Sequence, residues 1–557
     1  MSNLLTLHDP AKARERYLSG VWQTDTMYAL ARRHATERGS AYALRDGARR
    51  LTWSRLVAWA DVVAADLHEA GLRRGDRVSA WLPNRLENVV VFLACSRNGY
   101  VCNPSLHQNY TVAEIETLLS RIHCRALFAQ PGYGADAASA DVFACASALP
   151  HIKRVYALPA LQQPDAVLPV GAHAMPQVGP AARSPAMPPS THSDQVVYLA
   201  FTSGTTGAPK GVMHSDNTLL ANGRALVEDW GQNHHTVLLT LSPMSHHIGT
   251  VALEQALVSG CELVMHDTSA GVGALDWIVA TGATYVMGVP THAMDLLQEV
   301  ERRGLARLGA VRVFYMAGAP IPTETARKLS ALGAQPQNVY GMTENGSHQY
   351  TRPTDSMQVT TGTCGKACAG YEVRLWNPEN PDLEASPGEV GEIGGRGGVL
   401  MLGYFDNQTA TETSFNNSGW FLSGDLGHLD ADGNLQIVGR KKDLIIRGGH
   451  NIHPAHIEEY AHRHPDVKKA AVFGVADERL GEKVCLAIIC NDAAPAANDM
   501  LQHLAREGLS KFDMPEFYAV VTEFPLTPSG KILKRELIQW VATGRLQPEP
   551  VRYRATA

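Results

Sequence analysis

The sequence predicts a large α/β domain followed by a small α+β domain. Helical and strand patterns alternate from residue 51 to residue 129, which is typical of a parallel, doubly wound sheet covered by helices. After a helix expected at 452–462, strands and amphipathic helices follow without strict alternation, which indicates an α+β domain. A length of 557 residues with 45% hydrophobic side chains is enough for more than one buried core.

The segment that begins at residue 51 sets the pattern. Ser54 is predicted to cap an amphipathic helix, because serine accepts backbone hydrogen bonds at helix N-termini, and Gly71 is predicted to end it. Residues 157–193 are rich in Pro, Ala and Gln, break the alternation and are predicted to form a surface connection. Further expected elements are strands at 77–82 and 126–129 and helices at 88–96 and 112–119.

An apolar strand expected at 196–201 leads into a loop rich in glycine and hydroxyl groups at 202–211. Such a loop suits a polyphosphate, because its glycines let backbone N–H groups approach the anion, its hydroxyls donate hydrogen bonds and its lysine supplies positive charge. It is not a Walker A loop, since the spacing differs and Pro209 precedes the lysine. A plain polar turn would explain any three or four of these residues but not the whole string. The residues predicted to hold the phosphates are Thr202, Ser203, Gly204, Thr205, Thr206, Gly207 and Lys210.

Two later regions place polar or small residues at the ends of expected elements. The stretch 242–260 places His246 and His247 before an apolar helix, and on their own such histidines are more often core or capping residues. A strand expected at 313–316 runs into the small residues 317–320. Open α/β sheets bind ligands just beyond the carboxyl ends of their strands, so this turn is a candidate binding edge.

The stretch 338–346 reads NVYGMTENG and contains an acidic residue suited to a metal. Glu344 offers the hard oxygen ligand that Mg²⁺ prefers beside phosphates, and Thr343 can donate a hydrogen bond to a phosphate. Alone, a Thr-Glu pair is a common loop or capping element. Its place downstream of the phosphate loop favours a function in nucleotide binding.

These motifs closely resemble the signatures of the adenylate-forming superfamily, which includes acyl-CoA synthetases, luciferases and peptide-synthetase adenylation domains. The resemblance covers roughly residues 50–540, with the motifs in the family's order. It implies a layered α/β AMP-binding domain with a β subdomain over residues 1–441 and a mobile α+β C-terminal domain over 442–557. The motifs that carry it are YLAFTSGTTGAPKGVMHS at 198–215, YGMTE at 340–344, WFLSGD at 420–425 and PLTPSGKILKREL at 525–537.

The resemblance implies an ATP-dependent acid–CoA ligase that converts acid, ATP and CoA into acyl-CoA, AMP and pyrophosphate, with Mg²⁺ as cofactor. Lys531 would bridge the carboxylate and the α-phosphate, Thr343 would hold that phosphate and Glu344 would place the metal. Asp425 would accept hydrogen bonds from the ribose hydroxyls, and Arg440 would contact the ribose or the phosphate. ATP would also contact Gly318, Ala319, Pro320, Tyr340, Gly341 and Met342.

The resemblance also implies a hinge, a passage for CoA and an acyl pocket. Lys442 occupies the hinge position about which the C-terminal domain would swing, and Gly448 and Gly449 would face the pantetheine arm. His246 would lie near the reacting carboxylate and act with the catalytic residues. The acyl pocket would comprise His246, His247, Ile248, Gly288, Ala317 and Gly341.

The expected acid follows from what the acyl pocket lacks. Residues 242–250 contain no acidic side chain that could pair with a substrate ammonium, and burying such a charge unpaired would cost several kcal/mol. Amino acids should therefore be rejected. An apolar lining favours medium-chain, alicyclic or aryl acids, with acetate a poor substrate.

Composition argues against several other roles. The 49 basic and 55 acidic residues give a net charge of −6, unlike a general nucleic-acid binder. The nine cysteines form no CxxC motif, which favours reduced thiols over a structural zinc. No signal peptide and no apolar run of membrane-spanning length are evident, so we expect a cytoplasmic protein.

Three alternatives stay open. A stand-alone ligase would load the acyl or aryl group onto the phosphopantetheine of an acyl carrier protein instead of CoA. A luciferase-like oxidase of the acyl adenylate is less favoured. A non-catalytic nucleotide-binding relative is also less favoured, because Lys531, Glu344 and Asp425 are all present.

Overall fold

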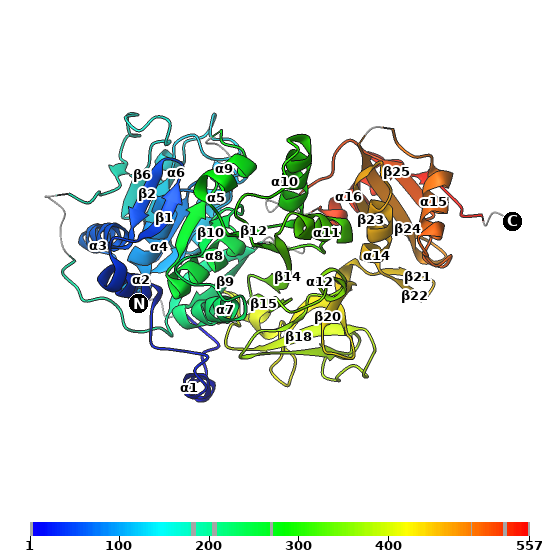
Figure 1. Cartoon of the computed structure of the whole chain (residues 1–557), viewed down its shortest axis with the longest axis horizontal. Coiled ribbons are helices and arrows are strands. Elements are labelled where there is room, and N and C mark those ends of the chain that lie inside the picture. Colours follow the sequence, from blue (N-terminus) through cyan, green and yellow to red (C-terminus); the bar gives the residue numbers. More distant parts are fainter. Residues whose placement is uncertain are drawn as a thin grey trace. The chain divides into compact units, whose positions relative to one another are not determined.

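The computed structural model describes residues 4–179, 185–202, 209–267, 271–491, 493–526 and 532–554. The chain divides into two compact units (Figure 1). The first unit comprises Met1–Val373, Gly395–Ser414 and Gly433–Leu435. The second comprises Arg374–Gly394, Phe415–Asp432 and Gln436–Ala557.

A nine-stranded sheet forms one layer of the first unit, in the order β16-β15-β14-β13-β12-β10-β11-β1-β2. The central pairs are parallel, and antiparallel pairs lie only toward the two edges, at β1/β2 and from β14 to β16. The strands are β1 (Tyr42–Asp46), β2 (Arg49–Thr52), β10 (Val237–Thr240), β11 (Glu262–Met265), β12 (Tyr285–Gly288), β13 (Val313–Ala317), β14 (Gln335–Met342), β15 (Gly346–Tyr350) and β16 (Lys366–Ala367).

A seven-stranded sheet forms a second layer of the first unit, in the order β7-β6-β5-β3-β4-β8-β9. Its pairs are parallel except the last, the antiparallel β8/β9 hairpin that flanks the phosphate loop. The parallel pairing expected from the alternating pattern therefore holds in the sheet centres. The strands are β3 (Arg77–Trp81), β4 (Val101–Asn103), β5 (Ala126–Ala129), β6 (Arg154–Ala157), β7 (His173–Ala174), β8 (Val196–Thr202) and β9 (Lys210–Ser215).

Helices cover both sheets and fill the space between them. Helices α4 (Leu86–Asn98) and α7 (Asp216–Asp229) contact strands of both sheets, so they belong to a shared middle layer, together with α2, α3 and α8. These layers confirm the expected α/β class. The other helices of the first unit are α1 (Pro10–Leu18), α2 (Met27–Arg38), α3 (Trp53–Glu69), α5 (Val112–Arg121), α6 (Val142–Ala148), α8 (His247–Ser259), α9 (Ala274–Thr281), α10 (Pro290–Arg302), α11 (Thr323–Ala331), α12 (Met357–Gly362) and α13 (Gln408–Glu412).

The cap predicted for α3 is wrong by two residues. Thr52, not Ser54, is the N-cap, and its hydroxyl accepts a hydrogen bond from the Arg55 N–H at 3.4 Å. The reason is that β2 runs directly into the helix, so the last residue of the strand has the extended backbone that a cap requires. Ser54 lies inside the first turn of the helix.

The second unit carries the smaller sheets. A four-stranded sheet, in the order β17-β18-β19-β20, contributes most of its residues to this unit, and a mixed six-stranded sheet with three helices completes it. Among the described residues of either unit, no helix has both the length and the apolar character to cross a bilayer. The elements are β17 (Tyr371–Trp376), β18 (Gly391–Gly397), β19 (Phe421–Leu429), β20 (Leu435–Arg440), the 3₁₀ helix η2 (Lys441–Asp443), β21 (Ile445–Arg447), β22 (His450–Ile452), α14 (Pro454–His462), β23 (Val467–Asp477), β24 (Gly481–Cys490), α15 (Ala497–Arg506), β25 (Phe517–Val520), α16 (Lys534–Ala542) and β26 (Glu549–Pro550).

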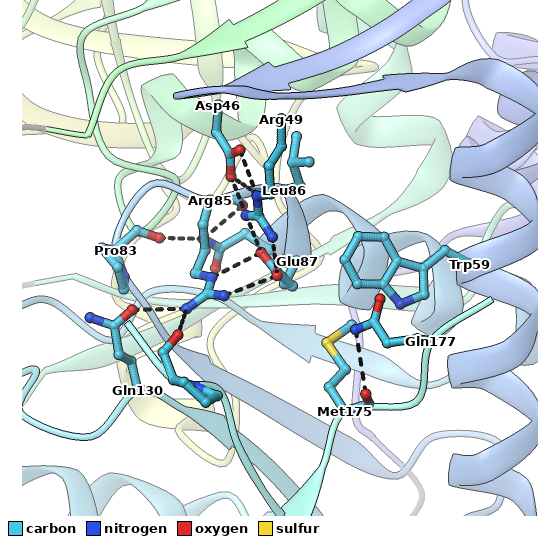
Figure 2. Close-up of polar contacts among 12 residues, drawn as sticks. Asp46, Arg49, Trp59, Pro83, Arg85, Leu86, Glu87, Gln130, Met175 and Gln177 are labelled. Carbon is cyan, nitrogen blue, oxygen red and sulfur yellow. Dashed lines mark hydrogen bonds and ion pairs between the residues drawn. The ribbon is translucent and has the colours of Figure 1, made fainter. Parts of the chain in front are cut away.

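A buried charge network ties the edge of the nine-stranded sheet to the start of α4 (Figure 2). Arg49 in β2 binds Asp46 and Glu87, with its Nη1 2.7 Å from Glu87 Oε1. Arg85 binds Glu87 from the other side at 2.8 Å, and the Leu86 N–H donates to Asp46 at 2.7 Å. Burial alone would raise the pKa of Glu87, but the hydrogen bonds from Arg49 and Arg85 lower it to about 2. Glu87 is therefore a charged link in the interior of the first unit.

Replacing Glu87 by glutamine should lower the free energy of unfolding by about 3–5 kcal/mol, because it leaves two arginines without their shared partner. Since its pKa falls from 4.5 to about 2 on folding, the contribution of Glu87 is complete above about pH 4.5 and is lost as the pH falls toward 2. Urea unfolding at pH 7 measures the change. Glu372→Gln, which breaks the exposed pair with Arg396, is the matched control and should cost under about 1 kcal/mol. Equal losses in the two variants would contradict a special role for the buried network.

Candidate active site

Eight of the predicted binding residues of the first unit lie at the carboxyl ends of three parallel strands. The register pairs Gly288 at the end of β12 with Met316 of β13, and Ala317 at the end of β13 with Val339 of β14. The turns that follow these strands therefore leave the sheet at one edge. The predicted residues brought to this edge are Gly288, Ala317, Gly318, Ala319, Pro320, Tyr340, Gly341 and Met342.

Two glycines at this edge are required by the backbone. A Cβ at Gly341 would lie 1.8 Å from the carbonyl oxygen of Gly346, because β14 and β15 approach closely where the chain reverses. Gly318 has φ +90, in the region that favours glycine, and its built Cβ would have only Val289 as a neighbour, at 3.9 Å. The first glycine thus allows a close approach, whereas the second allows the turn after β13.

The phosphate loop is described only at its two ends. Thr202 at the end of β8 faces Lys210 at the start of β9 in the antiparallel register, and both side chains are half-buried. The predicted phosphate-binding residues Ser203, Gly204, Thr205, Thr206 and Gly207 lie outside the described residues. The hairpin thus fixes where the loop leaves the seven-stranded sheet and where it returns.

Glu344 is linked to Lys210 through a residue that no sequence motif singled out, Tyr404. The Tyr404 hydroxyl donates to Glu344 Oε1 at 2.9 Å, and the Glu344 carboxylate is largely buried. The Lys210 ammonium lies 4.6 Å from the centroid of the Tyr404 ring, within the range of a cation–π contact. The lysine of the phosphate loop and the predicted metal-binding carboxylate therefore belong to one cluster.

Thr343 is held by a buried histidine, His214 of β9, which the sequence interpretation also missed. His214 Nε2 lies 2.7 Å from the Thr343 carbonyl oxygen, and its Nδ1 lies 3.0 Å from the Thr218 hydroxyl. Burial lowers the pKa of His214 to about 4, so the ring is neutral at pH 7. A carbonyl oxygen only accepts, so the single N–H of the neutral ring is on Nε2. The one sequence signal of this contact with Thr343 was that His214 is a polar residue in the apolar run before Ser215.

The two histidines predicted at the acyl pocket have different surroundings. His246 is the N-cap residue of α8 and stacks on the buried His107 at 4.4 Å. His247, in the first turn, stacks on His214 at 5.6 Å, and its Nδ1 lies 3.2 Å from the Tyr198 hydroxyl. Burial, and next the neighbouring His214, lower the pKa of His247 to about 3, so the ring is uncharged at neutral pH.

Tight packing fixes the start of α8. A Cβ at Gly249 would lie 2.6 Å from the Pro243 carbonyl oxygen, so the helix begins against the preceding turn. His246, His247 and Ile248 all keep part of their surface accessible there.

The two residues predicted to bind ribose meet in the second unit. Arg440 at the end of β20 binds Asp425 of the neighbouring strand β19, with 3.1 Å between Nε and Oδ1. The Asp425 side chain is only 9% exposed, whereas that of Arg440 is 38% exposed. The arginine thus orients a carboxylate that offers little of its surface to solvent. The predicted hinge residue, Lys442, is exposed in the short helix η2.

Gly448 and Gly449 form the two-residue turn of the β21/β22 hairpin, between the paired residues Arg447 and His450. Their φ values of +58 and +85 are those of a type I′ turn, which strongly favours glycine at both positions. A Cβ at Gly449 would meet no atom of the described residues within 4 Å, so the backbone conformation and not crowding favours glycine there. The turn conformation therefore explains why both residues are glycine, without reference to the predicted CoA passage.

Lys531, the predicted catalytic lysine, lies outside the described residues. The nearest described residues on either side, Leu526 and Ile532, form an isolated antiparallel bridge. Three residues beyond the lysine, Lys534 binds Glu458 of α14 at 2.7 Å. The chain is therefore anchored on both sides of the lysine.

Two family models together match most of the chain. The model described as AMP-binding enzyme matches residues 31–405, and that of the AMP-binding enzyme C-terminal domain matches residues 456–531. The chain belongs to the AMP-binding enzyme family. It is an adenylate-forming enzyme of the AMP-forming acyl-CoA ligase group, with carboxylic acids and CoA as the substrates of the family.

Curated relatives of this ligase act on different acids. The medium-chain fatty-acid–CoA ligase of Escherichia coli (strain K12) is 30% identical over 488 residues, covering 87% of this chain and 84% of that protein. The sulfoacetate–CoA ligase of Cupriavidus necator is 32% identical over 520 residues, covering 92% and 97%. The 2-hydroxy-7-methoxy-5-methyl-1-naphthoate–CoA ligase of Streptomyces carzinostaticus is 30% identical over 549 residues, covering 96% and 97%.

A solved structure shares the fold and holds the expected nucleotide. The o-succinylbenzoate coenzyme A synthetase of Bacillus subtilis, in complex with ATP and magnesium ion, superposes with a TM-score of 0.76 at 25% identity. The match covers 91% of this ligase and 98% of that chain.

The neutral state of His214 predicts a pH dependence of stability. In the unfolded chain His214 takes up a proton as the pH falls below 6.5, whereas in the folded protein it does so only near pH 4. The free energy of unfolding should therefore fall between these pH values, by up to about 3 kcal/mol. His214→Gln, whose amide can still donate to Thr343, should remove this part of the slope. Unfolding measured from pH 7.5 to 4.5 tests it, with the exposed His235→Gln as control. The same slope in wild type and His214→Gln would contradict a buried neutral ring.

Proposed function

We propose that this chain is an acid–CoA ligase that acts through an acyl adenylate on a medium-chain, alicyclic or aryl carboxylate. The observation that carries the proposal is the cluster of Lys210, Tyr404 and Glu344 beside Thr343. It combines a cation for a polyphosphate with a carboxylate for its metal ion. Lys210 begins β9 of the seven-stranded sheet, and Glu344 lies in the turn after β14 of the nine-stranded sheet.

Glu344 suits a Mg²⁺ ion that is bound mainly through phosphates. Its hard carboxylate is largely buried, and among the described residues no group of three His, Cys, Asp or Glu side chains could hold a metal without a ligand. When bound with ATP, Mg²⁺ would neutralise phosphate charge. Glu344 would supply the protein's oxygen ligand, and Tyr404 would keep that carboxylate in place.

The first half-reaction brings two anions together, so catalysis is mostly positioning and charge neutralisation. A carboxylate oxygen of the acid attacks the α-phosphorus of ATP, an acyl–O–P bond forms and pyrophosphate leaves with the electrons of the broken P–O bond. Lys531 would lie between the carboxylate and the α-phosphate, and Thr343 would hold the phosphate. Lys210 and the hydroxyls of the phosphate loop would bind the departing pyrophosphate.

In the second half-reaction the CoA thiol attacks the carbonyl carbon of the acyl adenylate, loses its proton and displaces AMP. Asp425, oriented by Arg440, would hold the ribose during both steps. Residues 442–557 would act as the mobile C-terminal domain that swings about Lys442 and carries Lys531 away. The turn at Gly448 and Gly449 would then border the passage for the pantetheine arm.

The assigned acyl pocket favours a hydrocarbon acid among those that relatives activate. Its six residues include no Lys, Arg, Asp or Glu, and the His247 ring is uncharged at neutral pH. A second anionic group on the acid, such as a sulfonate, would lack a cationic partner there, at a cost of several kcal/mol. Each buried CH₂ of a hydrocarbon acid instead gains about 0.8 kcal/mol.

Lys531→Ala should slow acyl-adenylate formation by at least about 10²-fold, the scale of one charge positioned in a transition state. Thioester formation from supplied acyl-AMP and CoA should stay near wild type. Acid-dependent pyrophosphate release and acyl-CoA production measure the two half-reactions. The exposed Lys468→Ala is the control and should change neither. Equal losses in both half-reactions would contradict the role of Lys531.

A panel of acids with ATP and CoA tests the substrate class. Hexanoate should exceed acetate in kcat/KM on the order of 10²-fold, because four more CH₂ groups are buried. Cyclohexanecarboxylate and benzoate should also be used, whereas sulfoacetate and amino acids should be inert. Acyl adenylate without acyl-CoA would indicate a carrier-protein acceptor. A preference for acetate, sulfoacetate or an amino acid would overturn the assignment of the pocket.

A further inference from the structure

The segment that carries Tyr404 extends the seven-stranded sheet alongside β9. Tyr404 forms an isolated antiparallel bridge with Val212. On either side of it, the Met213 N–H donates to the Gly403 carbonyl at 3.1 Å and the Phe405 N–H donates to the Gly211 carbonyl at 2.7 Å. This backbone pairing fixes the segment against the strand that begins with Lys210.

The same segment is tied to the turn that carries Glu344. The Met401 N–H donates to the backbone carbonyl of Glu344 at 2.7 Å, and the Tyr404 hydroxyl donates to its carboxylate at 2.9 Å. Thr411 adds a third anchor, because its hydroxyl accepts from the Tyr404 N–H at 3.0 Å. A displacement of Glu344 would therefore disturb the strand beside Lys210.

The Tyr404 side chain contacts both Glu344 and Lys210, and it also hydrogen-bonds Ser414. Its hydroxyl binds Glu344, whereas the face of its ring lies 4.6 Å from the Lys210 ammonium. A carboxylate oxygen only accepts hydrogen bonds, so the Tyr404 hydroxyl is the donor in its contact with Glu344.

We propose that Tyr404 is a positioning residue that couples Glu344 to Lys210, so that the metal and the polyphosphate of Mg·ATP are recognised as one unit. The inference rests on the proposed function, in which both partners serve ATP. The hydroxyl sets the orientation of the metal ligand, and partners that orient metal ligands typically change metal affinity 10–100-fold when they are removed. The ring holds the ammonium where the phosphates arrive.

Two substitutions separate the two contacts. Tyr404→Phe removes the hydroxyl and keeps the ring, so it should raise the Mg²⁺ concentration needed for half-maximal ATP binding by about 10-fold. Tyr404→Leu removes the ring as well, so it should weaken Mg·ATP binding by a further factor of about 3–10 at saturating Mg²⁺. Neither should change the affinity for AMP more than about two-fold, because AMP lacks the phosphates that Lys210 would hold.

Isothermal titration calorimetry of the full chain with ATP at several Mg²⁺ concentrations, and with AMP alone, measures these effects without turnover. Tyr28→Phe is the matched control, since that buried tyrosine also donates to a carboxylate, Asp61, at 2.7 Å. It should leave both ligands unaffected. If Tyr404→Leu fails to fold, the Tyr404→Phe variant still tests the hydroxyl contact with Glu344 on its own.

An unchanged Mg²⁺ requirement in Tyr404→Phe would overturn the proposal, and so would an equal loss of AMP and Mg·ATP binding, which indicates a purely structural role. Glu344→Gln adds a second test. In that background Tyr404→Phe should have little further effect on Mg²⁺ dependence, because the charged metal ligand that Tyr404 would orient is already gone. If no acid panel yields an acyl adenylate, the proposed function fails, but the calorimetry still reports on Tyr404.

Discussion

Parallel pairing of β12, β13 and β14 is the constraint on which the candidate site depends. The in-register ends of these strands place three turns at one edge of the nine-stranded sheet. The last backbone N–H and C=O groups of parallel strands have no further ladder partner, so such an edge can bind a ligand through the main chain. Side chains from elsewhere in the first unit are then arranged around a platform that the sheet itself provides.

Polar groups inside the first unit are stabilised in two different ways. In the network of Asp46, Arg49, Arg85 and Glu87, each carboxylate faces an arginine. Behind Thr343 the polar residues are uncharged, since burial keeps His214 and its neighbours in the neutral form. The backbone carbonyl of Thr343 is therefore held by a neutral donor.

The sequence was sufficient where the signal is contiguous. The apolar run predicted at 313–316 is the strand Val313–Ala317, and the motif 340–344 spans the end of β14 and the turn that follows it. The contacts of Tyr404 with Glu344 and of His214 with Thr343 could not be predicted, because they join residues 60 and 129 positions apart. Only the sheet topology brings these segments together.

Predictions made from local sequence rules also failed where a neighbouring element or turn determines the structure. Ser54 has a suitable side chain for a cap, but the length of β2 gives that position to Thr52. The glycines at 448 and 449 were interpreted through their expected ligand, whereas their turn geometry alone explains the residue type. Roles predicted for Lys531 and for residues 203–207 concern parts of the chain outside the described residues.

The close approach at Gly341 divides the proposed acyl pocket into replaceable and fixed parts. A Cβ there would meet a backbone carbonyl at 1.8 Å, and a backbone atom, unlike a side chain, has no other rotamer in which to yield. Any larger residue would push apart the two strands that carry Thr343 and Glu344 between them. Redesign of the proposed pocket for a new acid therefore has to be made at side-chain positions such as Ile248 and Ala317, while residue 341 stays glycine.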